Sequence, residues 1–408
     1  MKKVVLLNHS DSLGGASVVT RRLTDALRDA GVDARMLVSH CANPDDPTVS
    51  SVGTPATRKL TFLAEHADIF VRNGFSRADL FKASTGKYGL HIADHPLVRD
   101  ADVVCINWCN QGMLSLGGVQ RLADMGKRII WTMHDMWAMT GLCHHAASCD
   151  AYHSECGACP LLHWPPHRAD LARAVWRRKQ RLYAKAPITF VAVSHWLADR
   201  CRDSALLRDA DVRVIPNAFP CDNYNRPPRY SRRQLGITDT DTPIIVFGAA
   251  RLDDPIKGFG YAIDALNILH RNGVKALAVF FGNIRDAALL QRIELPHCYL
   301  GPLDADRVHS LYCHSRVVLS TSLYETLPGT LIEGQAAGCI PVTFGRGGQA
   351  DIVSHGVTGY IADYQSPESV AYYLTQALCS PIDPLSLKES VADKFAPQVI
   401  ARSYIDLF

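Results

Sequence analysis

The stretch "RVVLSTSLYETLPGTLIEGQAAGCIPVTF", residues 316–344, contains the parts of one strand–helix–strand unit in order. Its first and last apolar runs lack polar alternation, which is typical of strands buried on both faces. Pro328 and Gly329 mark a turn between them, and residues 330–337 have a helical composition. Because parallel strands are joined by such crossover helices, the stretch predicts a parallel α/β sheet.

The same alternation extends through almost the whole chain and restarts once. Residues 219–230 are rich in Pro, Asn and Tyr, and Pro227-Pro228 cannot lie inside a regular element, so we expect a linker there. We therefore predict an α/β protein with two Rossmann-like doubly wound domains facing across a cleft. The expected domains are residues 1–218, with an insertion at about 54–97, and residues 219–385. A C-terminal helix at 386–408 is expected to cross back to the first domain.

Composition and charge exclude some classes of function. The chain has 408 residues, 47% of them hydrophobic and 20% charged, as in ordinary globular proteins. A net charge of +3 is too small to indicate a nucleic-acid partner. The first apolar run stops at Leu7, which is too short for a signal peptide, and no run reaches the length of a membrane span. We expect a cytoplasmic protein, docked at most peripherally on the inner face of the plasma membrane.

Cations follow the first strand of the second half, in "GAARLDDPIKGFG" at residues 248–260. Arg251 and Lys257 lie beyond the end of this strand and next to a helix start. Two cations beside a helix N-terminus suit a diphosphate group, although a solvated loop has the same composition.

Two glutamates flank the turn of the opening stretch. Glu325 precedes the turn and Glu333 lies one helical turn inside the helix, whose free amides are expected near Gly329 and Thr330. A carboxylate at either place can accept hydrogen bonds from sugar hydroxyls. The alternative is that both glutamates interact only with the helix dipole.

A Gly14-Gly15 turn lies between the first strand and a helix. Glycines there allow a ligand to approach closely, and the helix N-terminus favours an anion. A plain turn, which is common in α/β proteins, is the alternative. The turn lacks the full G-x-G-x-x-G pattern, so a dinucleotide fingerprint is not supported.

Taken together, these motifs resemble the retaining GT-B glycosyltransferases of family four, in particular bacterial exopolysaccharide and lipopolysaccharide enzymes with a cysteine-rich loop. The Glu-x7-Glu motif of the family is matched by Glu325 and Glu333, and its Arg…Lys pair by Arg251 and Lys257. The run "GCIPVTFGRGGQADIVSHGVTGYI", residues 338–361, is also similar. The resemblance covers nearly the whole chain.

The resemblance assigns donor-phosphate contacts to cations and amides of the second domain. Arg251 and Lys257 would bind the diphosphate of a UDP-, GDP- or ADP-sugar. Backbone amides of Gly329, Thr330 and Leu331 would complete the sugar and phosphate contacts. Many family members have glycine where this chain has Pro328, which puts the donor-sugar preference in doubt.

The remaining roles implied by the resemblance concern sugars and the first domain. Glu325 would hold the transferred sugar and Glu333 the ribose. His134, at the end of an expected strand, would contact the transferring sugar, and Gly14 and Gly15 would meet the phosphates and the acceptor. The first domain would bind the acceptor, and the second the nucleotide sugar.

The implied reaction is transfer to a hydroxyl of a saccharide or lipid-linked saccharide in surface polysaccharide biosynthesis, with retention of configuration. No Asp-x-Asp motif lies in a suitable loop, so no catalytic metal is expected. A monomer or weak homo-oligomer is expected. A sugar-nucleotide epimerase and a non-catalytic nucleotide-sugar-binding protein are the alternatives.

A cysteine-rich loop at residues 138–166 follows His134. It contains Cys143, Cys149, Cys156 and Cys159 in the spacing C-x5-C-x6-C-x2-C. Three explanations stay open: a structural Zn²⁺ knuckle, reduced packing cysteines, or disulfides. The next segment, 168–183, is a basic helix with an apolar side, expected either to contact an anionic membrane or to present a solvated basic face. Its cations are Arg168, Arg173, Arg177, Arg178, Lys179 and Arg181.

Overall fold

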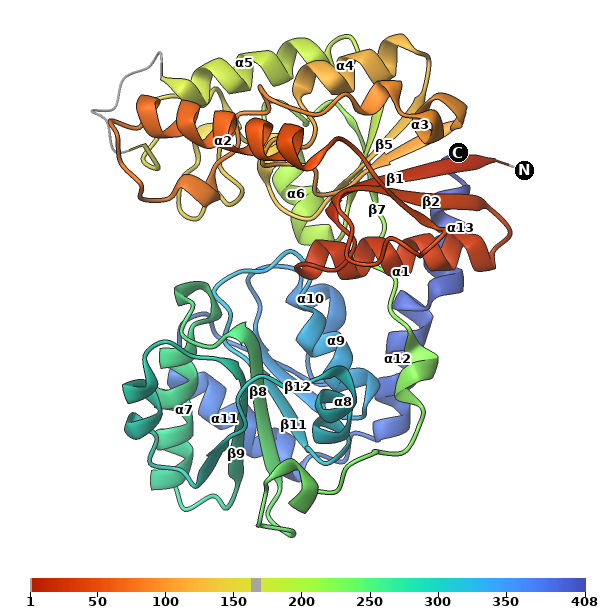
Figure 1. Cartoon of the computed structure of the whole chain (residues 1–408). Helices are drawn as coiled ribbons and strands as arrows, with labels where there is room; N and C mark the ends of the chain where they lie inside the picture. The colour runs from red at the N-terminus through yellow and green to blue at the C-terminus, as the bar shows by residue number, and fades with distance from the viewer. Residues whose placement is uncertain (1, 163–169) are drawn as a thin grey trace. The chain divides into compact units, whose positions relative to one another are not determined.

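The computed structural model of the protein describes residues 2–162 and 170–408 (Figure 1). The chain forms two compact units. Residues 1–218 and 397–408 make up unit 1, and residues 219–396 make up unit 2. Each unit is a parallel β-sheet covered by helices, so the predicted α/β class with two doubly wound sheets is confirmed.

Unit 1 contains a seven-stranded parallel sheet with the order β3-β2-β1-β4-β5-β6-β7. Strand β1 pairs with β2 on one side and with β4 on the other, so the strand order reverses at β1. The strands are β1 (Lys3–Ser10), β2 (Asp33–His40), β3 (Val49–Ser51), β4 (Val103–Ile106), β5 (Arg128–Met133), β6 (Ile188–Ala192) and β7 (Asp211–Val214).

The helices of unit 1 begin at polar caps in most cases. The side chains of Thr54, Ser115, Asp170 and Ser194 each accept a hydrogen bond from a backbone amide of the helix that follows. The helices are α1 (Gly15–Asp29), α2 (Pro55–Arg72), α3 (Pro96–Asp100), α4 (Leu116–Asp124), α5 (Leu171–Tyr183), α6 (His195–Asp203) and α13 (Pro397–Ile405).

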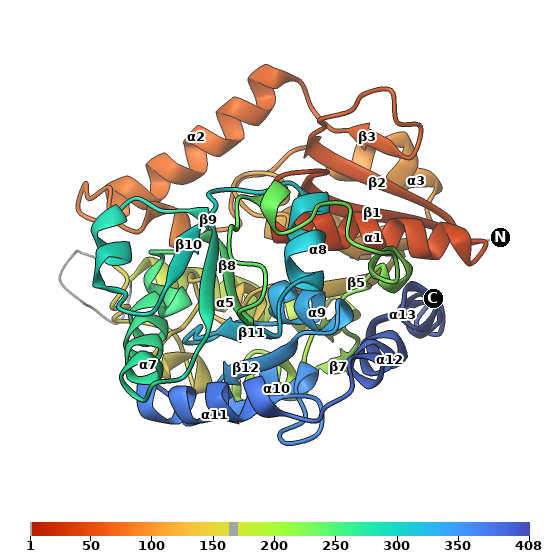
Figure 2. The same ribbon diagram turned by 90° about the horizontal axis from the view of Figure 1, so that it is seen from below.

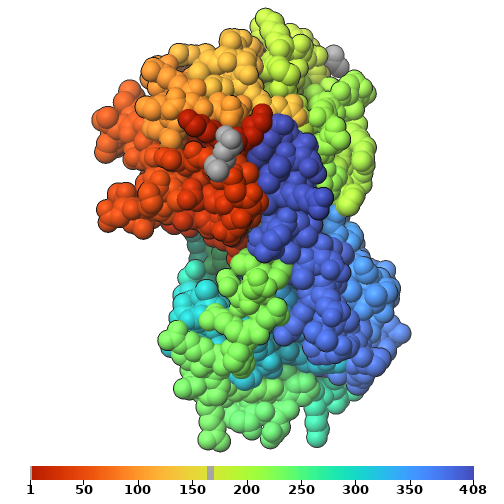
Figure 3. Space-filling view, turned by 90° about the vertical axis from the view of Figure 1, so that its right-hand side faces the viewer, coloured from red at the N-terminus to blue at the C-terminus, as the bar shows by residue number. Residues whose placement is uncertain are grey.

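The last residues of the chain return to unit 1. Helix α13 packs against α1, and the space-filling view shows the blue C-terminal residues against the red N-terminal ones (Figure 3). The hydroxyl of Tyr404 lies 2.8 Å from the hydroxyl of Thr132 on β5, and both side chains are buried. The preceding helix, α12 (Pro384–Phe395), belongs to unit 2 instead and packs against α9.

Unit 2 contains a six-stranded parallel sheet with the order β10-β9-β8-β11-β12-β13. Strand β8 pairs with β9 and with β11, so the reversal here lies between β8 and β11. The strands are β8 (Ile244–Arg251), β9 (Leu277–Asn283), β10 (His297–Tyr299), β11 (Val317–Ser320), β12 (Ile340–Phe344) and β13 (Tyr360–Ala362).

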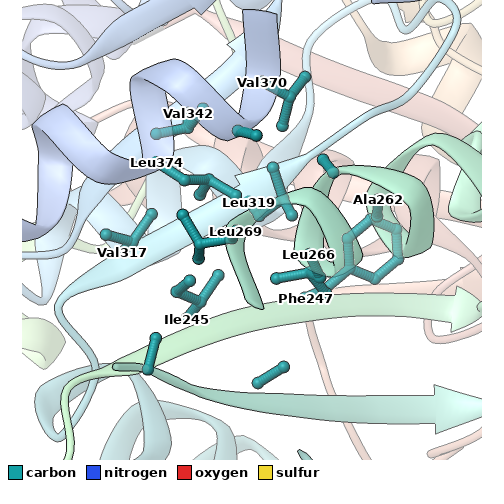
Figure 4. Close-up of a cluster of buried hydrophobic side chains, with 14 of the residues drawn as sticks. Ile245, Phe247, Ala262, Leu266, Leu269, Val317, Leu319, Val342, Val370 and Leu374 are labelled. Carbon is teal, nitrogen blue, oxygen red and sulfur yellow. The ribbon is translucent and has the colours of Figure 1, made fainter. Parts of the chain in front are cut away.

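The core of unit 2 lies between the sheet and two helices, α7 and α11, which lie side by side (Figures 1 and 2). Side chains from the strands pack there against Leu266 of α7 and Leu374 of α11 (Figure 4). The strand residues are Ile245, Leu319 and Val342, and all five side chains are at most 2% exposed. The remaining helices of the unit complete its layers. The helices are α7 (Phe259–Arg271), α8 (Ala305–Cys313), α9 (Gly329–Ala336), α10 (Gln349–Ile352), α11 (Pro367–Cys379) and α12.

Candidate functional site

The loops after β8 and β11 meet at the point where the strand order of unit 2 reverses. Open parallel sheets bind ligands at such a point, beyond the carboxyl ends of the strands. The amide of Leu323 donates to the carbonyl of Ile256 at 2.8 Å, and the hydroxyl of Thr321 donates to the carbonyl of Gly258 at 2.9 Å. A Cβ on Gly258 would lie 2.1 Å from the carbonyl oxygen of Thr321, and its φ is 62°, so this contact requires glycine.

The structure brings two predicted site residues into direct contact. Nζ of Lys257 lies 2.7 Å from Oε1 of Glu325, and the two side chains are 28% and 20% exposed. The hydroxyl of Ser322 donates to the same carboxylate oxygen at 2.7 Å. Lys257 and Glu325 therefore form one polar centre rather than two separate ones, and Ser322 is a supporting residue that the sequence did not reveal.

A Gly-Gly turn holds the backbone of Glu325. The amide of Gly348 donates to the carbonyl of Glu325 at 2.8 Å. A Cβ on Gly347, whose φ is 128°, would lie 2.5 Å from that carbonyl oxygen. The side chain of Gln349 is fully buried and donates to the carbonyl of Ser322 at 3.3 Å. This turn lies in the part of the sequence that resembles the family, but its contact with Glu325 could not be read from spacing.

Arg251 ends β8 within reach of two carboxylates. Its guanidinium lies 3.2 Å from Asp254 and 3.6 Å from Asp253. Nε of Arg251 and Oδ1 of Asp253 are nevertheless buried atoms with no hydrogen-bond partner among the described residues. These two atoms are the 3.6 Å pair, which is too long for a hydrogen bond. The side chain is 35% exposed, so the outer part of the guanidinium can meet a further anionic ligand.

The N-terminus of α9 lacks a side-chain cap. Its N-cap residue is Pro328, and the exposed Gly329 and half-buried Thr330 start the helix. Leu331 is fully buried and its amide donates to the carbonyl of Pro328 at 3.3 Å, so the expected contact between this amide and a ligand is not supported by the structure. Glu333 is half-buried one turn later. Burial raises the pKa of the neighbouring Tyr312 well above its usual value, and the negative charge of Glu333 raises it further.

In unit 1, the Gly14-Gly15 turn connects β1 to α1. Gly14 is the N-cap residue with φ 85°, and no side chain caps the helix. Nothing lies within 4 Å of the position that a Cβ would take on either glycine. The first turn of α1 contains no acidic residue, so its amide end is open to an anion.

His134 follows β5, and its Nε2 lies 3.1 Å from Oδ1 of Asn107, which follows β4. Burial lowers the pKa of His134 to about 4, so the ring is neutral at neutral pH. Since the amide oxygen of Asn107 can only accept, the proton is on Nε2. The neighbouring Asp135 accepts from the indole of Trp108 at 2.9 Å and contacts Nδ1 of His144 at 2.6 Å. The structure therefore ties the strand ends to the cysteine-rich loop.

Two family models cover most of the chain. Residues 231–393 match the model described as Glycosyl transferases group 1, and residues 13–223, more than half of the chain, match Glycosyltransferase Family 4. The chain belongs to glycosyltransferase family 4. The resemblance to family four inferred from the sequence is thereby confirmed.

Similar proteins include two curated relatives from bacteria. A putative colanic acid biosynthesis glycosyl transferase, WcaC of Escherichia coli K12, is 31% identical over 30% of this chain and 31% of its own length. The amylovoran biosynthesis glycosyltransferase AmsD of Erwinia amylovora is 32% identical over 30% of this chain and 36% of its own length. The match therefore spans about a third of the length of these relatives.

Solved structures have the same fold along the full chain. The structure of HepE from Anabaena in complex with UDP and glucose has a TM-score of 0.62 and 16% identity, covering 100% of this chain and 99% of that one. This agreement confirms the GT-B fold of the family 4 chain.

The four cysteines predicted to bind zinc are not grouped as a metal site in the structure. No group of three or more His, Cys, Asp or Glu among the described residues could hold a metal ion. All cysteines, each within the described part, are free thiols. Burial raises the pKa values of Cys143, Cys156 and Cys159 to about 11. Cys149 lies nearby, partly buried. The zinc knuckle therefore stays a prediction, and residues 163–166 of its loop lie outside the described residues.

The predicted basic helix corresponds to α5, and its residues 168–169 lie outside the described ones. Expecting Lys179 among its membrane-facing or solvated cations was wrong. The side chain is fully buried, over the ring of Trp137, and donates to the carbonyls of Trp137, Thr140 and Gly141. Carbonyls and an aromatic face replace water around this cation. No helix in the described part of the chain has both the length and the apolar composition needed to cross a bilayer.

Proposed function

We propose that this family 4 chain transfers a sugar from a nucleotide-diphosphate sugar to a hydroxyl of a saccharide or lipid-linked saccharide. The observation that carries the proposal is the centre formed by Lys257, Glu325 and Ser322, beside the uncapped N-terminus of α9. A cation, a carboxylate and free amides together suit a ligand with both phosphate and hydroxyl groups.

The donor diphosphate is held by Lys257, Arg251 and the first amides of α9. Binding of the diphosphate gives Lys257 a second anionic partner besides Glu325 and gives the guanidinium of Arg251 an anionic partner besides Asp253 and Asp254. When the bond from the anomeric carbon to the diphosphate breaks, negative charge develops on the leaving group. These fixed donors stabilise that charge, which favours a reaction without a catalytic metal.

The carboxylates hold sugar hydroxyls. Glu325 accepts hydrogen bonds from the transferred sugar, and Glu333, half-buried in α9, accepts them from the ribose. In unit 1, neutral His134 and the Gly14-Gly15 turn contribute to substrate binding. The acceptor oxygen forms the new bond on the face that the diphosphate leaves, and a phosphate oxygen takes the acceptor proton. Configuration is then retained without a protein base.

The proposed setting is surface polysaccharide biosynthesis, supported by the names of the bacterial relatives. The donor nucleotide is UDP, GDP or ADP. The structure of HepE with UDP and glucose makes a UDP-sugar the first donor to test. A structural Zn²⁺ at the four loop cysteines is a separate proposal. Metal analysis of the purified protein with thiol counting tests it, and free thiols without stoichiometric zinc would end it.

The experiment that tests the function is turnover with a panel of nucleotide sugars and saccharide acceptors. Glu325→Gln should reduce transfer at least about hundredfold, because it removes the carboxylate proposed to bind the sugar. Glu368→Gln, at an exposed position of the same unit, is the matched control and should keep full activity. Donor consumption that needs no acceptor and yields an epimer would replace transfer with epimerisation.

A further inference from the structure

Unit 1 contains a second cationic site that the proposed reaction does not use. A cavity of about 350 Å³ lies between the loop at Gly86-Lys87, the first turn of α4 and the C-terminal half of α5. Figure 1 shows α4 and α5 at the same end of unit 1, and the two helices are in contact. The polar residues that line the cavity are Lys87, Gln120, Arg178, Arg181 and Lys185.

The charged residues that line this cavity are all cations. Its described lining contains four cations and no carboxylate. Arg178 and Lys185 form no ion pair with any described side chain, and Nε of Arg181 donates to the carbonyl of Arg177 at 3.2 Å. Lys87 has partners outside the lining, since its Nζ lies 3.6 Å from Asp68 and 5.0 Å from the centre of the Tyr88 ring.

Part of this pattern has a structural explanation. Cations near the C-terminus of a helix interact favourably with its dipole, which applies to Arg181 in the last turn of α5 and to Lys185 just after its end. Arg178 and Arg181, however, are three positions apart on one helix, where like charges repel. Lys87 belongs to a different segment altogether. The dipole of α5 therefore does not account for four cations converging on one cavity.

Helix α4 adds an uncharged donor to the cavity. Its N-cap Ser115 accepts from the amide of Gly118 at 3.0 Å, and the amide of Leu116 donates to the carbonyl of Gly86 at 2.8 Å. Between them, the amide of Gly117 donates to no described acceptor, and Gly117 lines the cavity. An anion in the cavity would meet this free amide together with the positive end of the helix dipole.

We propose that this cavity binds a phosphoryl group. Two arginines offer paired donors that match phosphate oxygens, two lysines add point charges, and the Gly117 amide can bind a remaining oxygen. Such a group reaches the cavity either on an anionic phospholipid or on a water-soluble phosphate compound. The site uses residues of unit 1 only, so it does not depend on the donor site proposed in unit 2.

The test compares single variants of the full-length protein. Arg178→Gln and Arg181→Gln each remove one lining cation. Arg177→Gln is the matched control, because Arg177 is on the same helix and equally charged but lies outside the lining and pairs with Glu155 at 2.7 Å. All are exposed positions, and Lys87→Gln, on a separate loop, replaces any variant with a lowered melting temperature.

Two probes distinguish the sources of phosphate. Sodium pyrophosphate is titrated calorimetrically in a Lys257→Gln background, which weakens the proposed donor site. Phosphatidylcholine vesicles with and without phosphatidylglycerol are tested by co-sedimentation. Each lining variant should weaken binding about tenfold, the effect of losing one charge-assisted hydrogen bond, whereas Arg177→Gln should change it less than about twofold.

Selective weakening of pyrophosphate binding supports a soluble phosphate ligand. Selective loss of binding to phosphatidylglycerol vesicles supports a lipid headgroup. Two results would overturn the proposal. In the first, neither probe binds the protein whose cavity lining is unchanged. In the second, Arg177→Gln weakens binding as much as the lining variants do. The second result would mean that only the general charge of α5 matters.

Discussion

Replacing Asp135 by asparagine should destabilise unit 1 in a pH-dependent way. The carboxylate accepts from the amide of Trp137 at 2.8 Å and the indole of Trp108 at 2.9 Å, and it contacts His144 at 2.6 Å. Burial alone would raise its pKa, but His144 and the amide of Trp137 outweigh burial and lower the pKa to about 2. The ionised form is therefore favoured in the folded state.

The size of the effect follows from this pKa. A decrease from 3.8 to about 2 corresponds to about 2.5 kcal/mol of stability at neutral pH. Because the folded pKa is the lower one, the contribution is complete above the ordinary value and is lost as the pH falls through the folded value. Asp135→Asn should therefore cost about 2–3 kcal/mol at pH values near 7, and the cost should shrink between about pH 4 and pH 2.

The chain offers a selective assay for this prediction. All six tryptophans lie within residues 108–196, so tryptophan fluorescence during urea unfolding reports on unit 1. Asp100→Asn, at an exposed position of the same unit, is the control and should change stability by less than about 0.5 kcal/mol. A cost for Asp135→Asn that is as small as the control's, or that stays constant down to pH 2, would refute this account of the network.

Three further predictions concern the contacts of the site and the C-terminal helix. Ser322→Ala removes the hydroxyl that donates to Glu325, so kcat/KM should fall about tenfold or more; unchanged kinetics would exclude that support. Gly258→Ala should lower the melting temperature of unit 2 more than Gly273→Ala, because both glycines have positive φ but only Gly258 has a carbonyl in the way; equal shifts would contradict the close approach. Tyr404→Phe leaves the buried hydroxyl of Thr132 without its partner and should cost about 1–2 kcal/mol in urea unfolding; no cost would mean that this bond does not stabilise unit 1.

The buried strands were the most predictable part of the fold. Val4, Val5, Leu6 and Leu7 form a continuous apolar run and are at most 2% exposed in β1. Strands at sheet edges gave no such signal, because β3 and β13 are only three residues long and partly exposed. A run that short and mixed in polarity has no periodicity to recognise.

Helix α2 was hard to read because most of its buried residues are polar: Glu65 and His66 are buried beside Ile69. It buries Glu65, which accepts from the amides of Thr85 at 2.7 Å and Gly86 at 3.3 Å, and leaves Leu60 and Leu63 68% and 50% exposed. A pattern search places the apolar side of a helix inward, so it fails where a carboxylate is buried against backbone amides. The amides that satisfy Glu65 are twenty residues away and invisible to local reasoning.

The candidate site could be predicted by residue type but not by contact. The apolar runs of the sequence predict where the strands end, and three site residues follow such ends: Arg251, Lys257 and Glu325. The Lys257–Glu325 pair joins residues 68 positions apart, and the carboxylates beside Arg251 were not expected. Lys179 was misplaced for the same reason, since the carbonyls around it belong to a loop about forty residues earlier.

The central claim is that unit 2 binds the diphosphate of a nucleotide sugar through Lys257. Calorimetric titration of UDP, GDP and ADP into the full-length protein and its Lys257→Gln and Lys275→Gln variants tests it most directly. We expect at least one nucleotide to bind, Lys257→Gln to weaken that binding at least about tenfold, and Lys275→Gln, an exposed lysine of the same unit, to leave it unchanged. Binding that is equally strong in all three proteins, or absent from the unmodified one, would contradict the claim.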